Sequence, residues 1–325
     1  MTPVELSRTV QRAVRRAVDA GELSVTVPER VVVTPPGPGG CGDYATNVAL
    51  QLAGPAGQPP VRVAEILVPH LADATGVADV VVTGPGFLNI SLRSSSSPTA
   101  TLVGEIRGLG AGYGHGDALA GQVVALRVPY DVRAEVVADA VVRIVATQGG
   151  RGEVEHGEPV SLRPVPAPED PAPLGPDAAQ WALLHPAAHD RPRITADHLV
   201  QRESNPLFRV RYAHARVRAV GRGAWRLGFG AVPGDVPDAP GGLVTALADY
   251  PRILTGAATH RAPDRLARHL VTVADAALPF LPTVLPRGDE KPSAAHRARL
   301  ALAEAAGTVL AGGLSLLGIA APDHL

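Results

Sequence analysis

A proline-rich stretch near the middle of the chain constrains its fold more than any other feature. Residues 151–176 contain seven prolines and five acidic side chains against two arginines. Proline lacks the backbone N–H that helix interiors and central strands require, so neither element continues through such a stretch. We therefore predict an extended acidic linker at 151–176, with differently patterned halves on either side of it.

The first half carries a mixed pattern of helices and strands. Apolar residues at helical spacing predict helices, the first of them amphipathic with arginines off its apolar stripe. Two runs rich in β-branched residues, separated by a Gly-Pro-Gly turn, predict strands. The predicted elements are helices at 4–20, 44–53 and 61–74, strands at 30–34, 77–83 and 87–92, and a further helix at 99–109.

A strand predicted at 122–128 is followed by a helix predicted at 133–147. This order opens an α/β unit, but no clear repeat of the unit follows it. From Asp177 onward the spacing of apolar residues is helical almost throughout, and the last predicted helix, 296–317, is apolar on one face. The second half therefore predicts an all-α bundle.

Composition excludes several classes of protein. The chain has 325 residues, a net charge of −1 and one cysteine, Cys41. A single cysteine excludes an internal disulfide and a cysteine-based zinc site, and near-neutral charge disfavours a wholly basic nucleic-acid coat protein. The first residues lack an apolar signal core, and the apolar segment 306–321 is short for a membrane span. We expect a cytoplasmic protein with no membrane partner.

Several motifs resemble the arginyl-tRNA synthetase family. In the first half, GDYATNVALQLA at 42–53 and GPGFLNI at 84–90 are similar to the amino-terminal domain of these enzymes. In the second half, the matches to their DALR-type anticodon-binding domain are LGPDAA at 174–179, NPLFRVRYAHAR at 205–216, RLARHL at 265–270 and LLGIAAP at 316–322.

The resemblance implies a fold class and a set of domain boundaries. The expected fold is an α+β amino-terminal domain, a short remnant of a class I Rossmann-type α/β unit, and an all-α carboxy-terminal helix bundle. The corresponding residues are 1–115 for the first domain, 116–150 for the remnant, 151–176 for the linker and 177–325 for the anticodon-binding-like domain.

The catalytic signatures of the family do not occur in this sequence. The family activates arginine with ATP through a His-x-Gly-His motif and a Lys-Met-Ser-Lys-Ser-like loop, whose cations stabilise the triphosphate. Here Pro129-Tyr130-Asp131-Val132 occupies the junction where the first motif belongs, and Lys291 is the single lysine. We therefore expect a pseudoenzyme with no catalytic residues and no cofactor, ATP being needed only under a ligase alternative.

Candidate tRNA-binding residues follow from the resemblance together with charge. Arginines between 202 and 226 form two helical stripes on nearly opposite sides, so both cannot face one RNA, and one stripe is expected to make intramolecular salt bridges. Arg265 and Arg268 share one helical face in the RLARHL motif at 265–270. The candidate phosphate contacts are Arg209, Arg211, Arg216, Arg218, Arg265 and Arg268.

Two further candidates belong to the amino-terminal domain, which meets the tRNA elbow in this family. Phe87 and Asn89 follow the glycine turn, where an aromatic ring and an amide can contact an unstacked base. Burial of Phe87 in the core is the favoured alternative for that residue, and burial is also favoured for Tyr212 and His214. Pro186 falls between His185 and His189 and no third ligand is evident, so we expect no metal site.

Three functions remain open from the sequence. The first is a non-catalytic tRNA-binding protein that holds the elbow and anticodon stem of tRNA, with arginine tRNA expected, and leaves the acceptor end to a partner protein. The second is a residual or partner-completed arginine–tRNA ligase. The third is a protein-interaction module that docks on a synthetase. The single aromatic at 277–282, Phe280, departs from the aromatic-rich family pattern and argues against strict anticodon reading.

Overall fold

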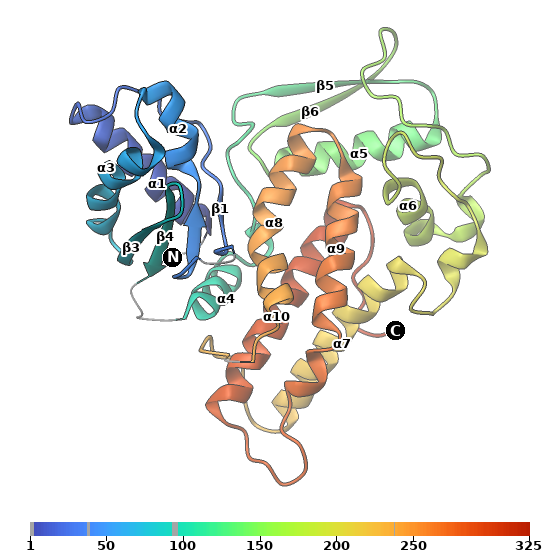
Figure 1. The fold of residues 1–325 in the computed structure, drawn as a ribbon. Coiled ribbons are helices and arrows are strands. Elements are labelled where there is room, and N and C mark those ends of the chain that lie inside the picture. Colours follow the sequence, from blue (N-terminus) through green and yellow to red (C-terminus); the bar gives the residue numbers. More distant parts are fainter. Residues whose placement is uncertain (1–2, 38–39, 93–96, 237) are drawn as a thin grey trace. The chain divides into compact units, whose positions relative to one another are not determined.

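The computed structural model describes residues 3–37, 40–92, 97–236 and 238–325 (Figure 1). The chain divides into two compact units, residues 1–102 and 103–325. The division falls inside α4 (Pro98–Leu109), earlier than the predicted boundary at 115. Residues 103–115 join the second unit because Tyr113 is buried there, stacks on Tyr250 and donates a hydrogen bond from its hydroxyl to the Leu247 carbonyl.

The first unit packs three helices on one face of a four-stranded antiparallel sheet. Its core joins the apolar stripe of α1, including Leu6 and Val10, to Leu67 of α3 and to Leu88 and Ile90 of β4. The elements are α1 (Pro3–Asp19), β1 (Val33–Thr34), β2 (Tyr44–Thr46), α2 (Val48–Ala56), α3 (Pro60–Ala72), β3 (Val77–Thr83) and β4 (Phe87–Leu92), with strand order β1-β2-β4-β3.

The two predicted strands at 77–83 and 87–92 are confirmed at both ends, but the predicted helix at 44–53 is partly wrong. Tyr44–Thr46 is strand β2, which pairs antiparallel with β4, and the helix begins only at Val48. Three residues are too few to show strand alternation in a sequence. The pairing partner β4, whose paired residues lie 42 to 46 positions later in the chain, decides this segment's conformation.

After the end of α4 and a short turn, the second unit contains a parallel pair of strands, β5 (Val123–Val128) and β6 (Arg151–His156), joined by α5 (Val132–Ala146). The first residues of the predicted linker therefore form a strand, which corrects the linker prediction at 151–156. The strand is polar and half exposed, and backbone pairing to β5 defines it. Helix α5 approaches β6 so closely that a Cβ at Gly152 would lie 2.7 Å from the Val142 side chain.

The rest of the second unit is a helix bundle, as predicted. Its longest helices, α7 and α10, pack against each other and against α9 (Figure 1). The bundle comprises α6 (Pro176–Leu184), α7 (Pro206–Arg226), α8 (Gly241–Thr259), α9 (Pro263–Ala277) and α10 (Ala294–Leu316), with short 3-10 turns η1 (Gly110–Gly112), η2 (Ala172–Leu174), η3 (Ala196–Leu199) and η4 (Leu281–Thr283). In the described residues, no helix combines the length and apolar character that crossing a membrane requires.

Candidate nucleic-acid interface

Helix α7 carries four of the six predicted phosphate contacts, and its start is fixed by its N-cap. The Asn205 side-chain oxygen accepts hydrogen bonds from the backbone N–H groups of Leu207 and Phe208, at 3.1 and 3.4 Å. Its amide nitrogen donates to the carbonyls of His198 and Val200, both at 2.9 Å. Pro206 stands at the first helical position, where no backbone N–H is needed. The capped start orients the following 21-residue helix.

One face of α7 is buried against α9 and α10, which leaves its arginines on two flanks. The approach to α10 is close, because a Cβ at Gly307 would lie 2.8 Å from Val217. The buried positions of α7 are Leu207, Val210, Ala213, His214, Ala215, Val217, Val220 and Ala224. The predicted burial of His214 is confirmed, and its Nδ1 lies 2.9 Å from the Pro322 carbonyl oxygen.

The flank that holds Arg211, Arg218 and Arg222 is engaged by the protein itself. Arg211 pairs with Asp177 at 3.3 Å, and Arg218 pairs with Asp323 at 2.8 Å. Arg222 donates to the Asp323 carbonyl at 3.3 Å. The prediction that one stripe forms intramolecular salt bridges is confirmed. The role of Arg211 and Arg218 in tRNA binding stays a prediction.

The other flank presents aromatic rings together with arginine. Tyr212 stacks on Phe208 with ring centroids 5.3 Å apart, and the Arg216 guanidinium lies over the Tyr212 ring at 6.0 Å. Arg209, on the same flank, pairs with Asp275 at 3.1 Å. The predicted burial of Tyr212 is wrong: it is 36% exposed, because its position on the helix faces away from α9 and α10. We call Phe208, Tyr212 and Arg216 the aromatic–arginine ladder.

Sequence reasoning missed Trp225, whose side chain is 81% exposed in the last turn of α7. A surface cavity of about 570 Å³ opens beside it, lined by Arg218 and Arg222 of α7 and Glu304 of α10 among others. Burial raises the pKa of Glu304, which Arg107 and Arg218 partly offset. Composition could have pointed to Trp225, because aromatic residues make up only 3% of the chain and each one is therefore a candidate for a specific role.

The two arginines predicted on α9 lie apart from the ladder. Arg268 pairs with Asp264 one turn away at 2.8 Å, and Arg265 lies 3.4 Å from the His260 ring nitrogen. Both side chains are exposed. The six predicted arginines therefore line several surfaces and form no single cluster. Phe280, the aromatic that survives from the family pattern, is buried at 4% exposure.

Phe87 and Asn89 lie on the sheet face opposite the helices of the first unit. Phe87 is 40% exposed, so its predicted burial in the core is wrong. Side chains alternate between the two faces of a strand, and in β4 it is Leu88 and Ile90 that point into the core. Asn89 is 2% exposed within strand β4 and accepts from the backbone N–H of Cys41. Its amide nitrogen donates to the Thr83 hydroxyl at 2.6 Å. Both polar ends of the Asn89 side chain are therefore hydrogen-bonded within the protein, whereas the Phe87 ring is exposed to solvent.

His185 and His189 lie at the end of α6 and in the loop after it. His185 stacks on buried Trp181, with ring centroids 5.0 Å apart. His189 is exposed and lies 3.7 Å from Asp190. Across residues 3–37, 40–92, 97–236 and 238–325, no group of three His, Cys, Asp or Glu side chains is arranged to hold a metal ion.

Family models match one segment of the chain in each of the two units. A family model described as the arginyl tRNA synthetase N terminal domain matches residues 5–92, and one described as the DALR anticodon binding domain matches residues 210–325. The chain carries an arginyl-tRNA synthetase N-terminal domain and a DALR anticodon-binding domain. The DALR anticodon-binding domain begins inside α7, so Tyr212, Arg216 and Trp225 all belong to it.

Curated relatives give the same assignment over part of their length. The arginine–tRNA ligase of Renibacterium salmoninarum is 47% identical over 127 residues, 38% of this chain and 23% of that protein. The arginine–tRNA ligase of Paenarthrobacter aurescens is 37% identical over 169 residues, 48% of this chain and 30% of that protein. The chain thus spans less than a third of the length of these relatives.

Solved structures confirm the fold class. The arginyl-tRNA synthetase of Thermus thermophilus matches with a TM-score of 0.68 at 15% identity, covering 100% of both chains. That of Plasmodium falciparum matches with a TM-score of 0.63 at 8% identity, again covering 100% of both. At these identities the likeness shows the fold alone. The predicted mixture of an α+β amino-terminal region and a helical DALR domain is confirmed.

Proposed function

We propose that this chain is a tRNA-binding protein that does not itself charge tRNA. The observation that carries the proposal is the aromatic–arginine ladder, whose exposed members Tyr212 and Arg216 lie inside a matched anticodon-binding domain. Bases stack on exposed aromatic rings, and unpaired guanidinium groups bind phosphates. In the described part of the chain Arg216 makes no ion pair, so an RNA phosphate would displace no carboxylate from it.

Two exposed aromatic residues outside the ladder are separate candidates for contact with tRNA, Trp225 on the flank of Arg218 and Arg222 and Phe87 in the first unit. Trp225 is available for base stacking at the far end of α7, and Phe87 of the first unit is available for contact with the tRNA elbow. Stacking of a base on an aromatic side chain contributes about 1–3 kcal/mol. Arginine tRNA is the expected ligand because the first matched domain is described as that of arginyl-tRNA synthetase and the curated relatives are arginine–tRNA ligases.

The non-catalytic part of the proposal rests on the β5–α5 junction. Strand β5 ends at Val128, and Asp131 caps α5 by accepting from the backbone N–H of Ala134 at 3.0 Å. No His-x-Gly-His precedes this helix, and Lys291 is the only lysine of the chain. We propose that a partner protein acts on the acceptor end of the bound tRNA.

Binding of the purified chain to arginine tRNA and to several other tRNAs over a salt series tests the proposal. We expect an affinity that falls steeply with salt. Arg216→Gln should flatten the slope of log affinity against log salt by about 1, because one phosphate contact is lost. Trp225→Ala should weaken binding by about 1–3 kcal/mol.

Arg151→Gln is the matched control, since Arg151 is exposed on β6 and its loss changes net charge equally. It should bind tRNA like the unaltered protein. Absence of tRNA binding at low salt, or equal losses in all three variants, would overturn the proposal.

The exposed apolar end of α7 favours a protein-interaction module as the second candidate. Trp225 and, two residues later, Leu227 at 50% exposure form part of this end. A protein partner held by apolar contact would bind with little dependence on salt, and Trp225→Ala would weaken that complex while Arg216→Gln would not.

A further inference from the structure

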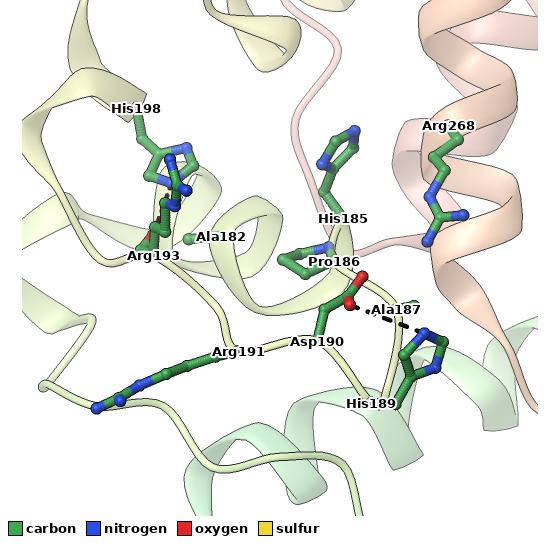
Figure 2. A pocket seen from close by; sticks show the side chains of 10 residues that line it. All are labelled: Ala182, His185, Pro186, Ala187, His189, Asp190, Arg191, Arg193, His198 and Arg268. Carbon is green, nitrogen blue, oxygen red and sulfur yellow. Dashed lines mark hydrogen bonds and ion pairs between the residues drawn. The ribbon is translucent and has the colours of Figure 1, made fainter.

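A cavity of about 480 Å³ lies between α6, η3 and α9, and none of its lining residues belongs to the ladder (Figure 2). Its charged lining is strongly unbalanced, with three histidines and three arginines against a single carboxylate. The charged and titratable lining residues are His185, His189, Asp190, Arg191, Arg193, His198 and Arg268.

The loop that forms the cavity is held by a buried arginine. Arg133 of α5 is fully buried, and its guanidinium donates hydrogen bonds to five backbone carbonyls and to no carboxylate. The acceptors are the carbonyls of Leu183 at 3.0 Å, Val165 at 2.6 Å, Asp190 at 2.7 Å, Pro186 at 3.1 Å and Ala187 at 2.9 Å. The cavity is therefore preformed, which lowers the cost of binding a ligand there.

The positive charge of the cavity is only partly neutralised. Asp190 lies near His189, and Arg268 pairs with Asp264 at 2.8 Å. In the described residues, the guanidinium groups of Arg191 and Arg193 make no ion pair. Figure 2 shows Arg193 beside His198, whose Nε2 lies 2.9 Å from the Arg193 carbonyl oxygen.

His185 reports the electrostatics of this cavity. Burial, together with the charges of Arg268 and His198, lowers the pKa of His185 to about 4. At neutral pH its imidazole is therefore uncharged, because burial disfavours the charged form and the charge of Arg268 adds to that effect. A bound anion would reverse that effect and favour the imidazolium form.

We propose that this cavity binds a phosphate group. Guanidinium groups match the geometry of phosphate oxygens through paired N–H donors, and imidazoles add hydrogen bonds that strengthen on protonation. The phosphate belongs either to an RNA backbone or to a small phosphorylated molecule. The site does not depend on the proposed tRNA-binding function, because inorganic phosphate alone tests it.

Histidine NMR of the full chain, titrated with inorganic phosphate, is the experiment. The His185 imidazole signals are identified as those missing from the His185→Gln spectrum. We expect a saturable shift of these signals with phosphate and none with chloride at equal ionic strength. Arg193→Gln should weaken the phosphate affinity about tenfold, because one charge-assisted hydrogen bond is lost.

Arg151→Gln, with the same change in net charge outside the cavity, should retain the phosphate response. Arg193 is exposed, so its replacement leaves the fold intact, and an unchanged amide spectrum of the variant verifies this. An equal response to phosphate and chloride, or an equal affinity in Arg193→Gln and the unaltered protein, would overturn the site.

A competition arm identifies the source of the phosphate. A shift of the His185 signals on addition of tRNA alone, with no further shift when phosphate is added, assigns the site to an RNA backbone. Persistence of the phosphate signal in the presence of saturating tRNA assigns it to a small phosphorylated ligand. Failure of tRNA binding with an intact phosphate response would reject the proposed function and keep the site.

Discussion

Arg133 shows how one residue organises the second unit. Its charge is buried among backbone carbonyls that belong to three separate segments: the end of α6, the loop after it and Val165. Burial lowers the pKa of Arg133, but a guanidinium stays protonated in proteins. Five N–H donors in one planar group satisfy carbonyls that no element of secondary structure pairs.

Replacement of Arg133 by methionine should destabilise the protein strongly. Most of these carbonyls would lose their hydrogen-bond donor inside the protein, although Ala187 keeps the one from the backbone N–H of Asp190. We expect a loss of at least about 3 kcal/mol in the free energy of unfolding. Arg133→Lys, with three donors, should lie between methionine and the unaltered protein. Urea denaturation measures both. Arg151→Met, on the surface, should change stability by less than about 0.5 kcal/mol, and a similarly small change for Arg133→Met would contradict the role assigned to Arg133.

At the scale of elements, the start of α7 is the point on which the candidate interface depends. Asn205→Ala removes two hydrogen bonds to the first turn and two to the preceding segment. We expect a loss of about 1–2 kcal/mol in unfolding free energy, at the upper end of N-cap effects because Asn205 is buried. Chemical denaturation measures it. Ser204→Ala, exposed one residue earlier, is the control, and equal losses in both would show that the cap contributes nothing specific.

Elements with a strong internal period could be predicted from sequence, and elements defined by a partner could not. Strands β3 and β4 are β-branched or apolar runs on either side of a glycine turn, and helix α10 repeats its apolar residues at helical spacing. Strands β2 and β6 are short or polar, and pairing with β4 and β5 creates them. Strand β6 was missed because residues 151–176 were treated as one proline-rich linker. The first proline of this stretch is Pro159, after the strand has ended, so no proline prevents the strand from forming.

The residue types of the candidate site could be predicted from the sequence, but which of these residues are exposed and unpaired could not. Two arginine stripes followed from helical spacing, but which one pairs internally depended on Asp177 and Asp323, far from α7 in sequence. Phe87 and Tyr212 are apolar enough for a core, and only the packing of their elements leaves them exposed. The sequence around Trp225 contains no pattern that would distinguish an exposed tryptophan from a buried one.

At the scale of the whole molecule, a net charge of −1 conceals local positive surfaces that internal carboxylates partly neutralise. Asp323, near the end of the chain, accepts from Arg218 through both carboxylate oxygens, at 2.8 and 3.4 Å. The hydrogen bond from Arg218 lowers the pKa of Asp323, so its carboxylate is charged at neutral pH. An RNA phosphate that binds this flank must therefore compete with Asp323 for Arg218.

Asp323→Asn should strengthen tRNA binding under the proposed function. The substitution frees Arg218 for phosphate, so the slope of log affinity against log salt should steepen by up to about 0.9. Asp238→Asn is a matched control, because Asp238 pairs with Arg299 on another surface and its loss changes net charge by the same amount. A larger gain for Asp323→Asn than for Asp238→Asn assigns tRNA to the Arg218 flank. Equal gains would reduce the effect to net charge, and no gain for Asp323→Asn would confine tRNA to the opposite flank, where Arg216 already lies free of carboxylates in the described residues.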